Sequence, residues 1–287
     1  VDPVMNNQSK MTDAAAIPAP FREPGEKVIR NVNWPGTYAL YKKEVRRFMK
    51  VQLQTVWAPA IQTLLFLVIF SIALGGGNRT VLGVPFTDFI APGLIVGTGM
   101  LQAAFQNSSF SLLAGKMQGT IIDYLMPPIS AGELLFALVA ASVTRACVVG
   151  VALWIAMALW PGVHVTPIHP WAIMWFGIGG AMLISFIGVL TSIWADKFDH
   201  GAAITNFVIA PLSLLSGTFY AIDRLSPLFR TLSHANPFFY IISGFRYGFL
   251  SRADSNVPTG AVVLLGLNLL LGAACYVALR RGWKIKA

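Results

Sequence analysis

Charged side chains are rare in the apolar parts of this chain, and those that occur there are the residues best placed to do chemistry. Arg246 lies in the segment NPFFYIISGFRYGFL, residues 236–250, with no acidic residue beside it. Arg145 lies in another apolar stretch, 12 residues after Glu133. Because a cation in an apolar environment needs a carboxylate, a carbonyl group or water, each arginine indicates a structural pair or contact with a polar ligand. We favour structural pairing for Arg145, and for Arg246 both interpretations remain open.

Recognisable catalytic and metal-binding motifs are missing from the sequence. The histidines at positions 164, 169, 200 and 234 are scattered over predicted loops, and Cys147 and Cys275 fall inside apolar runs. Neither set has the spacing of a metal site. The sequence also lacks H-E-x-x-H, G-x-S-x-G and the phosphate loop G-x-x-x-x-G-K-[ST]. We therefore predict no catalytic residue, no metal site and no cofactor in this chain.

Composition places these residues in a membrane protein. Of the 287 residues, 55% are hydrophobic and 11% are charged, and the mean hydropathy is +0.65. A soluble domain has about 25% charged residues. Six stretches reach the roughly 20 apolar residues that span a bilayer; they cover about 55–76, 88–112, 132–160, 170–194, 202–221 and 259–279. Because lipid cannot hydrogen-bond the backbone, we predict an all-α membrane protein.

Lysine and arginine predict the orientation of the spans. With the N-terminus inside, the cytoplasmic segments hold fifteen Lys and Arg residues and the outer segments five. The positive-inside rule then places both termini in the cytoplasm. The net charge of +9 follows from this distribution and does not indicate a nucleic-acid surface. Residues 1–34 are polar and lack an apolar core, so we interpret them as a flexible cytoplasmic tail and not as a targeting peptide.

The residue pattern over 35–54 predicts an amphipathic helix that precedes the first span. One face carries Tyr38, Tyr41, Val45, Phe48 and Gln52, and the other carries Lys42, Lys43, Arg46, Arg47 and Lys50. This pattern is typical of a helix that lies in the inner headgroup layer. It serves either as a simple anchor of the first span or in gating, and the pattern does not distinguish the two.

Several spans contain more polar residues than an anchor needs. The second span holds Gln102, Gln106 and Asn107 followed by two serines, and the fifth holds Asn206. Adjacent amides and hydroxyls need partners inside a dry bundle, and a watered path would supply them. We therefore predict a translocation path that includes these four residues and Arg145. The alternative for the run after Gln106 is that the span emerges there into the cytosol.

Two further segments are interrupted in ways that exclude an ordinary span. The loop AGKMQGTIIDYLMPPISAGELL, residues 114–135, predicts a short helix that ends sharply at Pro127 and Pro128. Such a rigid element suits a lever between a soluble motor and the membrane, although the same pattern fits an ordinary connection. Residues 222–250 are broken by Pro227, Pro237 and Gly244. We predict that half-helices break at Pro237 and at Gly244.

In their order these elements resemble the permease subunit of type 2 ABC exporters. The resemblance rests on FIAPGLIV in the second span, GTIIDYLMPPIS in the loop, FVIAPLSLLSGTFY in the fifth span and NPFFYIISGFRYGFL before the last. It covers about residues 35–285 and is closest to the bacterial branch that includes drug, polysaccharide and lipo-oligosaccharide exporters. A membrane domain over residues 55–287 is thereby implied.

The resemblance implies two sites in this chain. A coupling helix at 119–128 would dock on an ATPase through Gly119, Thr120, Ile122, Asp123, Met126 and Pro127. Residues 222–250 would form re-entrant helices at the outer leaflet, with an outer gate made by Phe219, Tyr220, Pro237, Tyr240 and Arg246.

The resemblance also implies partners. Six spans form half a transporter, so two copies, or one copy and a paralogue, would assemble with two ATPase subunits in the bacterial inner membrane; we favour a homodimer. ATP and magnesium would bind those subunits. The substrate would pass along the second and fifth spans, and we expect a lipid-linked, glycan or drug-like compound. A secondary carrier or channel is the alternative, and an intramembrane enzyme a more remote one.

Overall fold

The structure is a computed structural model that describes residues 32–75, 80–220 and 226–284. Six helical segments in this part of the chain are long and apolar enough to cross a membrane. They confirm the all-α class and the predicted number of spans. Within the described residues, the extended structure consists of one short hairpin, β1 (Thr80–Val81) and β2 (Val84–Pro85).

Three of the six spans contain a π-helical turn. The first span joins η1 (Leu53–Trp57) to α2 (Ala58–Gly75), the second is α3 (Phe86–Gly93), η2 (Leu94–Met100) and α4 (Leu101–Met117), and the fifth is α8 (Phe198–Ile204), η3 (Thr205–Ile209) and α9 (Ala210–Leu215). The third, fourth and sixth spans are α6 (Ala131–Ala158), α7 (Pro170–Trp194) and α12 (Val257–Arg281). The turns η1, η2 and η3 matter because such turns in long helices often occur at functional sites.

The second span is the centre of the bundle. In its most apolar window 89% of residues are buried, against 17% in the fifth span and 22% in the first. Its half α4 packs closely on α7, where a Cβ atom at Gly188 would lie 2.0 Å from the Oγ of Ser108. The first and fifth spans instead keep large apolar surfaces exposed, as lipid-facing or partner-facing helices do.

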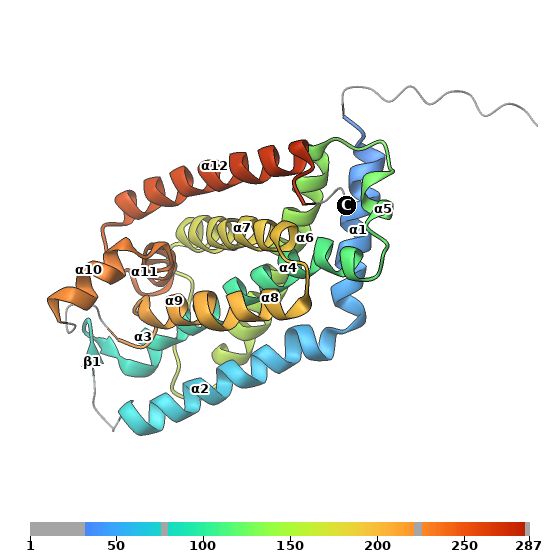
Figure 1. Cartoon of the computed structure of the whole chain (residues 1–287). Helices are drawn as coiled ribbons and strands as arrows, with labels where there is room; N and C mark the ends of the chain where they lie inside the picture. The colour runs from blue at the N-terminus through green and yellow to red at the C-terminus, as the bar shows by residue number, and fades with distance from the viewer. Residues whose placement is uncertain (1–31, 76–79, 221–225, 285–287) are drawn as a thin grey trace, which may run out of the picture. The chain divides into compact units, whose positions relative to one another are not determined.

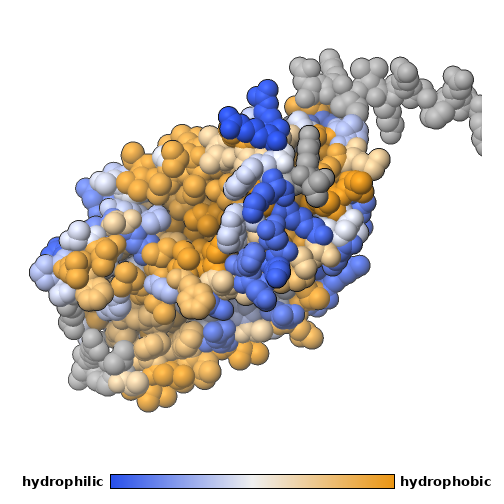
Figure 2. All heavy atoms as spheres, viewed as in Figure 1, coloured by the Kyte–Doolittle hydropathy of each residue, from blue (hydrophilic) through white to orange (hydrophobic). Residues whose placement is uncertain are grey.

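The four shorter helices gather at the two ends of the bundle (Figure 1). At one end lie α1 (Trp34–Lys50), α5 (Ile122–Leu125) and the C-terminal end of α12. At the other end lie α10 (Pro227–Ala235), α11 (Pro237–Leu250) and the β1–β2 hairpin. In Figure 2 apolar residues dominate the surface between these ends, and hydrophilic residues collect toward them. The arrangement fits a bundle that crosses a bilayer from end to end.

The predicted break at Gly244 is wrong. Helix α11 runs without interruption from Pro237 to Leu250, and only the break at Pro237 coincides with a helix boundary. Gly244 is required for packing instead, because a Cβ atom there would lie 2.4 Å from the ring of Phe176. The interruption by Pro227 is at the first residue of α10. Residues 222–225 of the predicted re-entrant segment lie outside the described residues.

Two other boundaries differ from the sequence-based expectation. The fifth span ends at Leu215 and not near residue 221, because Gly217 takes a positive φ of 78° that an α-helix does not allow. In α1 the buried side chains are Thr37, Leu40, Glu44 and Phe48, whereas Tyr38 is 62% exposed. Of the predicted apolar face, only Phe48 is among these buried side chains. Whether α1 lies in the headgroup layer stays a prediction.

Candidate functional site

A polar cavity of about 490 Å³ lies among α1 and the first, second, third and fifth spans. Its lining includes Gln106 and Asn107 from α4, Arg145 from α6 and Asn206 from η3. Four of the five predicted path residues are thus brought together. The fifth, Gln102, lines a second cavity of about 170 Å³ with Gln62, Thr63 and Thr98.

The π-helical turns border these cavities. Gln54 and Thr55 from η1 and Thr205 and Asn206 from η3 line the larger cavity, and Thr98 from η2 lines the smaller one. A π-helical turn widens the helix and rotates the following residues. Part of the polar lining of both cavities therefore comes from the π-helical turns.

Arg145 is the most deeply placed cation of the cavity wall. Its side chain is 6% exposed, and its Nη2 atom donates to Oε1 of Gln106 at 3.0 Å. That partner is a neutral amide and not a carboxylate. The buried Nε atom of Arg145 has no hydrogen-bond partner among the described residues.

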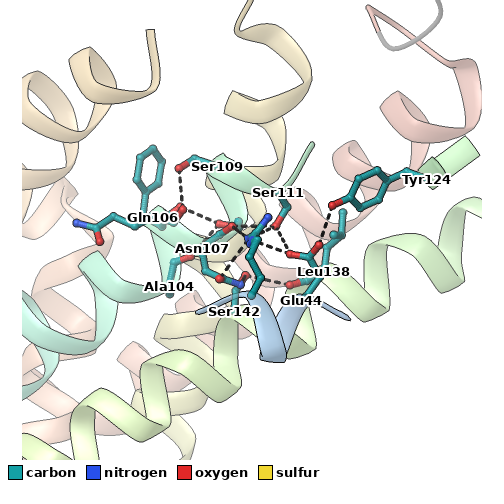
Figure 3. Close-up of polar contacts among 12 residues, drawn as sticks. Glu44, Ala104, Gln106, Asn107, Ser109, Ser111, Tyr124, Leu138 and Ser142 are labelled. Carbon is teal, nitrogen blue, oxygen red and sulfur yellow. Dashed lines mark hydrogen bonds and ion pairs between the residues drawn. The ribbon is translucent and has the colours of Figure 1, made fainter. Parts of the chain in front are cut away.

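A second group of polar side chains lies beside Arg145, centred on Glu44 of α1 (Figure 3). Glu44 is fully buried and accepts hydrogen bonds from the hydroxyls of Ser111 at 2.8 Å and Tyr124 at 2.9 Å. Its carboxylate also pairs with Nη2 of Arg47 at 2.9 Å. Asn107 joins the group by donating to Ser142 at 3.0 Å. These contacts satisfy the carboxylate from three sides, as a buried charge requires.

Arg47 connects this group to the cavity. The same Nη2 atom donates to the backbone oxygen of Asn107 at 3.0 Å and to Ser111 at 2.9 Å, while its buried Nη1 atom has no partner in the described part of the chain. Arg47 belongs to the predicted basic face of α1, and no role was predicted for Glu44. The available signal was a single acidic residue three positions before an arginine within a basic helix.

The short helix α5 is the element that Glu44 holds. Tyr124 is its buried residue, and Nζ of Lys43 lies 3.9 Å from the centroid of the Tyr124 ring. Burial, reinforced by the neighbouring Glu44 carboxylate, raises the pKa of the Tyr124 phenol above its ordinary value. The phenol is therefore held neutral as a hydrogen-bond donor at physiological pH.

The predicted coupling residues surround Tyr124 and are exposed. They are Gly119, Thr120, Ile122, Asp123, Met126 and Pro127. Met126 is 76% exposed and Ile122 57%, so α5 presents large apolar side chains at the surface. The following loop is tied to the start of α1, because Asn33 donates to the backbone oxygen of Pro128 at 3.0 Å and its backbone N–H donates to Glu133. Glu133 is the third residue of α6 and forms a capping box with Ser130.

At the opposite end, Arg246 has an acidic partner that lies eight residues further along the sequence. The side chain is fully buried and forms an ion pair with Asp254. It also donates to the backbone oxygens of Phe89 at 3.2 Å and Gly217 at 2.8 Å, and the guanidinium carbon lies 3.8 Å from the centroid of the Phe89 ring. Arg246 thus joins the second span, the end of the fifth span and α11.

The other predicted gate residues make separate contacts and do not form one cluster with Arg246. Phe219 packs on Phe70 of the first span with ring centroids 4.4 Å apart, and the Tyr220 hydroxyl donates to the backbone oxygen of Leu214 at 3.4 Å. Pro237 begins α11, and Tyr240 lies on the same helix next to Phe239. Their role in a gate stays a prediction.

The described residues contain no cluster of three or more potential metal ligands.

Fold and site together define a multi-pass helical membrane protein with polar cavities inside its bundle. A family model for "ABC-2 type transporter" matches residues 35–250, and the chain therefore belongs to the ABC-2 type transporter family. The chain is 31% identical over 250 residues to the inner membrane transport permease YadH of Escherichia coli (strain K12), covering 87% of this chain and 96% of that one.

More distant relatives carry another name. The chain is 22% identical over 237 residues to nodulation protein J of Sinorhizobium fredii (strain NBRC 101917 / NGR234), covering 81% of this chain and 85% of the relative. It is 24% identical over 228 residues to nodulation protein J of Rhizobium leguminosarum bv. viciae, covering 79% and 85%. The chain is accordingly a multi-pass inner membrane protein and a transport permease.

Proposed function

We propose that this chain is the transmembrane subunit of an ATP-driven exporter whose ATP is hydrolysed by a separate subunit. The observation that carries the proposal is that α5 is exposed on one side and bound to α1 on the other. Its outer side chains, including Asp123 and Met126, are exposed, while Tyr124 fixes the helix to buried Glu44 of α1. An exposed element that is firmly held from behind can receive a force from a soluble partner and pass it to the bundle.

The proposed assembly holds two copies of this chain and two ATPase subunits, with ATP and magnesium bound to the ATPase subunits alone. A second copy is supported by large exposed apolar side chains on the spans that border the cavities. Leu65 of the first span is 56% exposed and Phe207 of the fifth 81%. Burying such surface against another copy is favourable, although lipid contact also accounts for it. A paralogue in place of one copy is the alternative.

The proposed direction of transport is from the cytoplasm outward, along the second and fifth spans. Both termini and α5 lie on the cytoplasmic side in this proposal, since that end of the bundle holds the basic α1. Polar cavities inside an otherwise apolar bundle suit an amphipathic or glycan-type compound, such as a lipid-linked, oligosaccharide, polysaccharide or drug-like molecule.

Isolation of the tagged chain from native membranes tests the proposal. We expect a protein with a phosphate-binding loop to co-purify in equal amount, and the eluate to hydrolyse ATP. Replacing the catalytic glutamate of that partner should abolish the hydrolysis. A chain that elutes without any ATP-binding protein, and that transports solutes on an ion gradient alone, would instead be a secondary carrier.

A further inference from the structure

The charge balance of the larger cavity is unusual. Two guanidinium groups, Arg47 and Arg145, contribute to its wall, and none of the described residues that line it is acidic. Glu44 lies behind Arg47 and is already saturated by Arg47, Ser111 and Tyr124. The wall therefore carries about one unbalanced positive charge, and because Arg145 is buried this charge is costly without an anion.

Both guanidinium groups also have hydrogen-bonding capacity left over. Nε of Arg145 and Nη1 of Arg47 are buried without a partner in the described chain. Both side chains line the same cavity, where Arg145 contacts Gln106 and Arg47 contacts Asn107. Two fixed guanidinium groups of this kind are suited to the oxygens of a phosphate, sulfate or carboxylate.

The remaining lining is suited to a molecule with an apolar part. Phe48, Val51 and Phe110 line the cavity together with the amides, and Val51 and Phe110 are 49% and 47% exposed at its edge. An anionic group between the arginines would therefore leave an attached chain beside apolar side chains. Inorganic anions would gain the ionic contacts only.

We propose that this cavity binds the anionic group of an amphipathic ligand, with Arg47 and Arg145 as its counter-charges. The inference rests on the proposed function in so far as the ligand is the exported compound, and it narrows the substrate to an anionic amphiphile. Binding itself needs this chain alone.

The test is ligand binding to the purified chain in a neutral detergent, measured by native mass spectrometry without any ATPase subunit. The probes are dodecyl phosphate, uncharged dodecanol, phosphatidylglycerol and inorganic phosphate. We expect dodecyl phosphate to bind at least tenfold more tightly than dodecanol and than inorganic phosphate. Preference for phosphatidylglycerol over dodecyl phosphate would identify a membrane lipid as the amphiphile; equal binding of inorganic phosphate would overturn the amphiphile assignment.

Variants locate the site. Arg145→Gln and Gln106→Glu should each weaken dodecyl phosphate about tenfold or more, the second by placing a carboxylate on Arg145. Arg145→Lys should retain part of the affinity. Arg280→Gln, which removes an exposed arginine from the end of α12, is the matched control and should change nothing.

The proposal is overturned if the wild-type chain binds dodecyl phosphate and dodecanol alike, a result that does not depend on how the variants fold. It is also overturned if folded Arg145→Gln and Gln106→Glu bind as the wild type does. Neither outcome bears on the ATPase partner, and the absence of a partner would leave the binding assay valid.

Discussion

Two arginines are buried in the described part of the chain, and they lie in opposite electrostatic settings. Arg246 has a carboxylate, two backbone oxygens and an aromatic face around it. Arg145 has one neutral amide. A fully compensated buried cation is typical of structural joints, and an incompletely compensated one is typical of binding sites. At the scale of single residues, this contrast separates the part of the bundle that must be rigid from the part that can receive a ligand.

Arg246→Met should destabilise the fold by about 3–5 kcal/mol, because it leaves Asp254 buried without its ion pair. The free energy of unfolding in mixed micelles measures the effect. Arg280→Met, at an exposed position, provides the control and should stay within about 0.5 kcal/mol of the wild type. If Arg246→Met lowers the free energy of unfolding by no more than about 0.5 kcal/mol, the ion pair between Arg246 and Asp254 does not stabilise the fold.

Tyr124→Phe should cost about 2 kcal/mol, since a hydrogen bond to a buried carboxylate is lost. Because the pKa of Tyr124 is raised in the fold, the folded protein holds the phenol proton more tightly than the unfolded chain does. Stability of the wild type should then fall as pH rises above about 10, the ordinary tyrosine pKa. The phenylalanine variant lacks this fall, so the difference in stability should narrow above pH 10. A difference that is constant with pH would contradict the assignment.

Residue types in the sequence drew attention to the buried arginines Arg145 and Arg246 but not to the buried carboxylates Glu44 and Asp254. Asp254 reaches Arg246 because α11 ends at Ser251 with a left-handed φ of 53°, which turns the chain back. Glu44 reaches Tyr124 across 80 residues of sequence. Such partnerships depend on turns and on packing between distant helices, which periodicity does not encode.

The number of membrane-spanning helices was predictable from the sequence, but the irregular turns within them were not. Their apolar lengths predicted the spans, whereas the π-helical turns η1, η2 and η3 have no clear signature in the residues. The set of buried side chains in α1 was not predicted, because a buried glutamate does not belong to an apolar face. Helical amphipathicity averages over a face and does not detect a buried ion pair.

Packing of α11 on α7 gives a prediction about glycine. Gly244→Ala should destabilise the protein by about 1–3 kcal/mol, because the new methyl group overlaps the Phe176 ring. Gly266→Ala in α12 is the matched control: no atom lies within 4 Å of its Cβ position, and it should be neutral or stabilising by roughly 0.5–1 kcal/mol. Thermal unfolding in detergent compares the two. An equal change in unfolding temperature for both variants would contradict the close approach of α11 and α7.

The exposed side of α5 gives a prediction about coupling. Asp123→Ala should lower the ATP hydrolysis that the chain stimulates in the assembled complex about tenfold or more, while thermal stability stays unchanged because the side chain is exposed. Asp199→Ala, at an exposed aspartate in the first turn of α8, serves as the control. Full activity of Asp123→Ala would remove α5 from the coupling role.

For the whole molecule, composition and charge already indicated six spans and a multi-pass membrane protein, because the bilayer imposes length and hydrophobicity on every span. The sequence did not indicate that the second span is the buried centre or that the first span also lines both polar cavities. Those features follow from how helices pack. Helix packing places α5 and α1 at one end of the bundle, and α10 and α11 at the other (Figure 1).

The most direct test of an ATP-driven permease is site-specific photo-crosslinking in native membranes. A photoreactive amino acid at the position of Asp123 in α5 should capture an ATP-binding subunit, and one at Leu228 of α10, which is 68% exposed at the opposite end, should not. Capture from α5 alone would support the docking of an ATPase on this helix. Capture from Leu228, or from neither position in a transport-active membrane, would contradict the account.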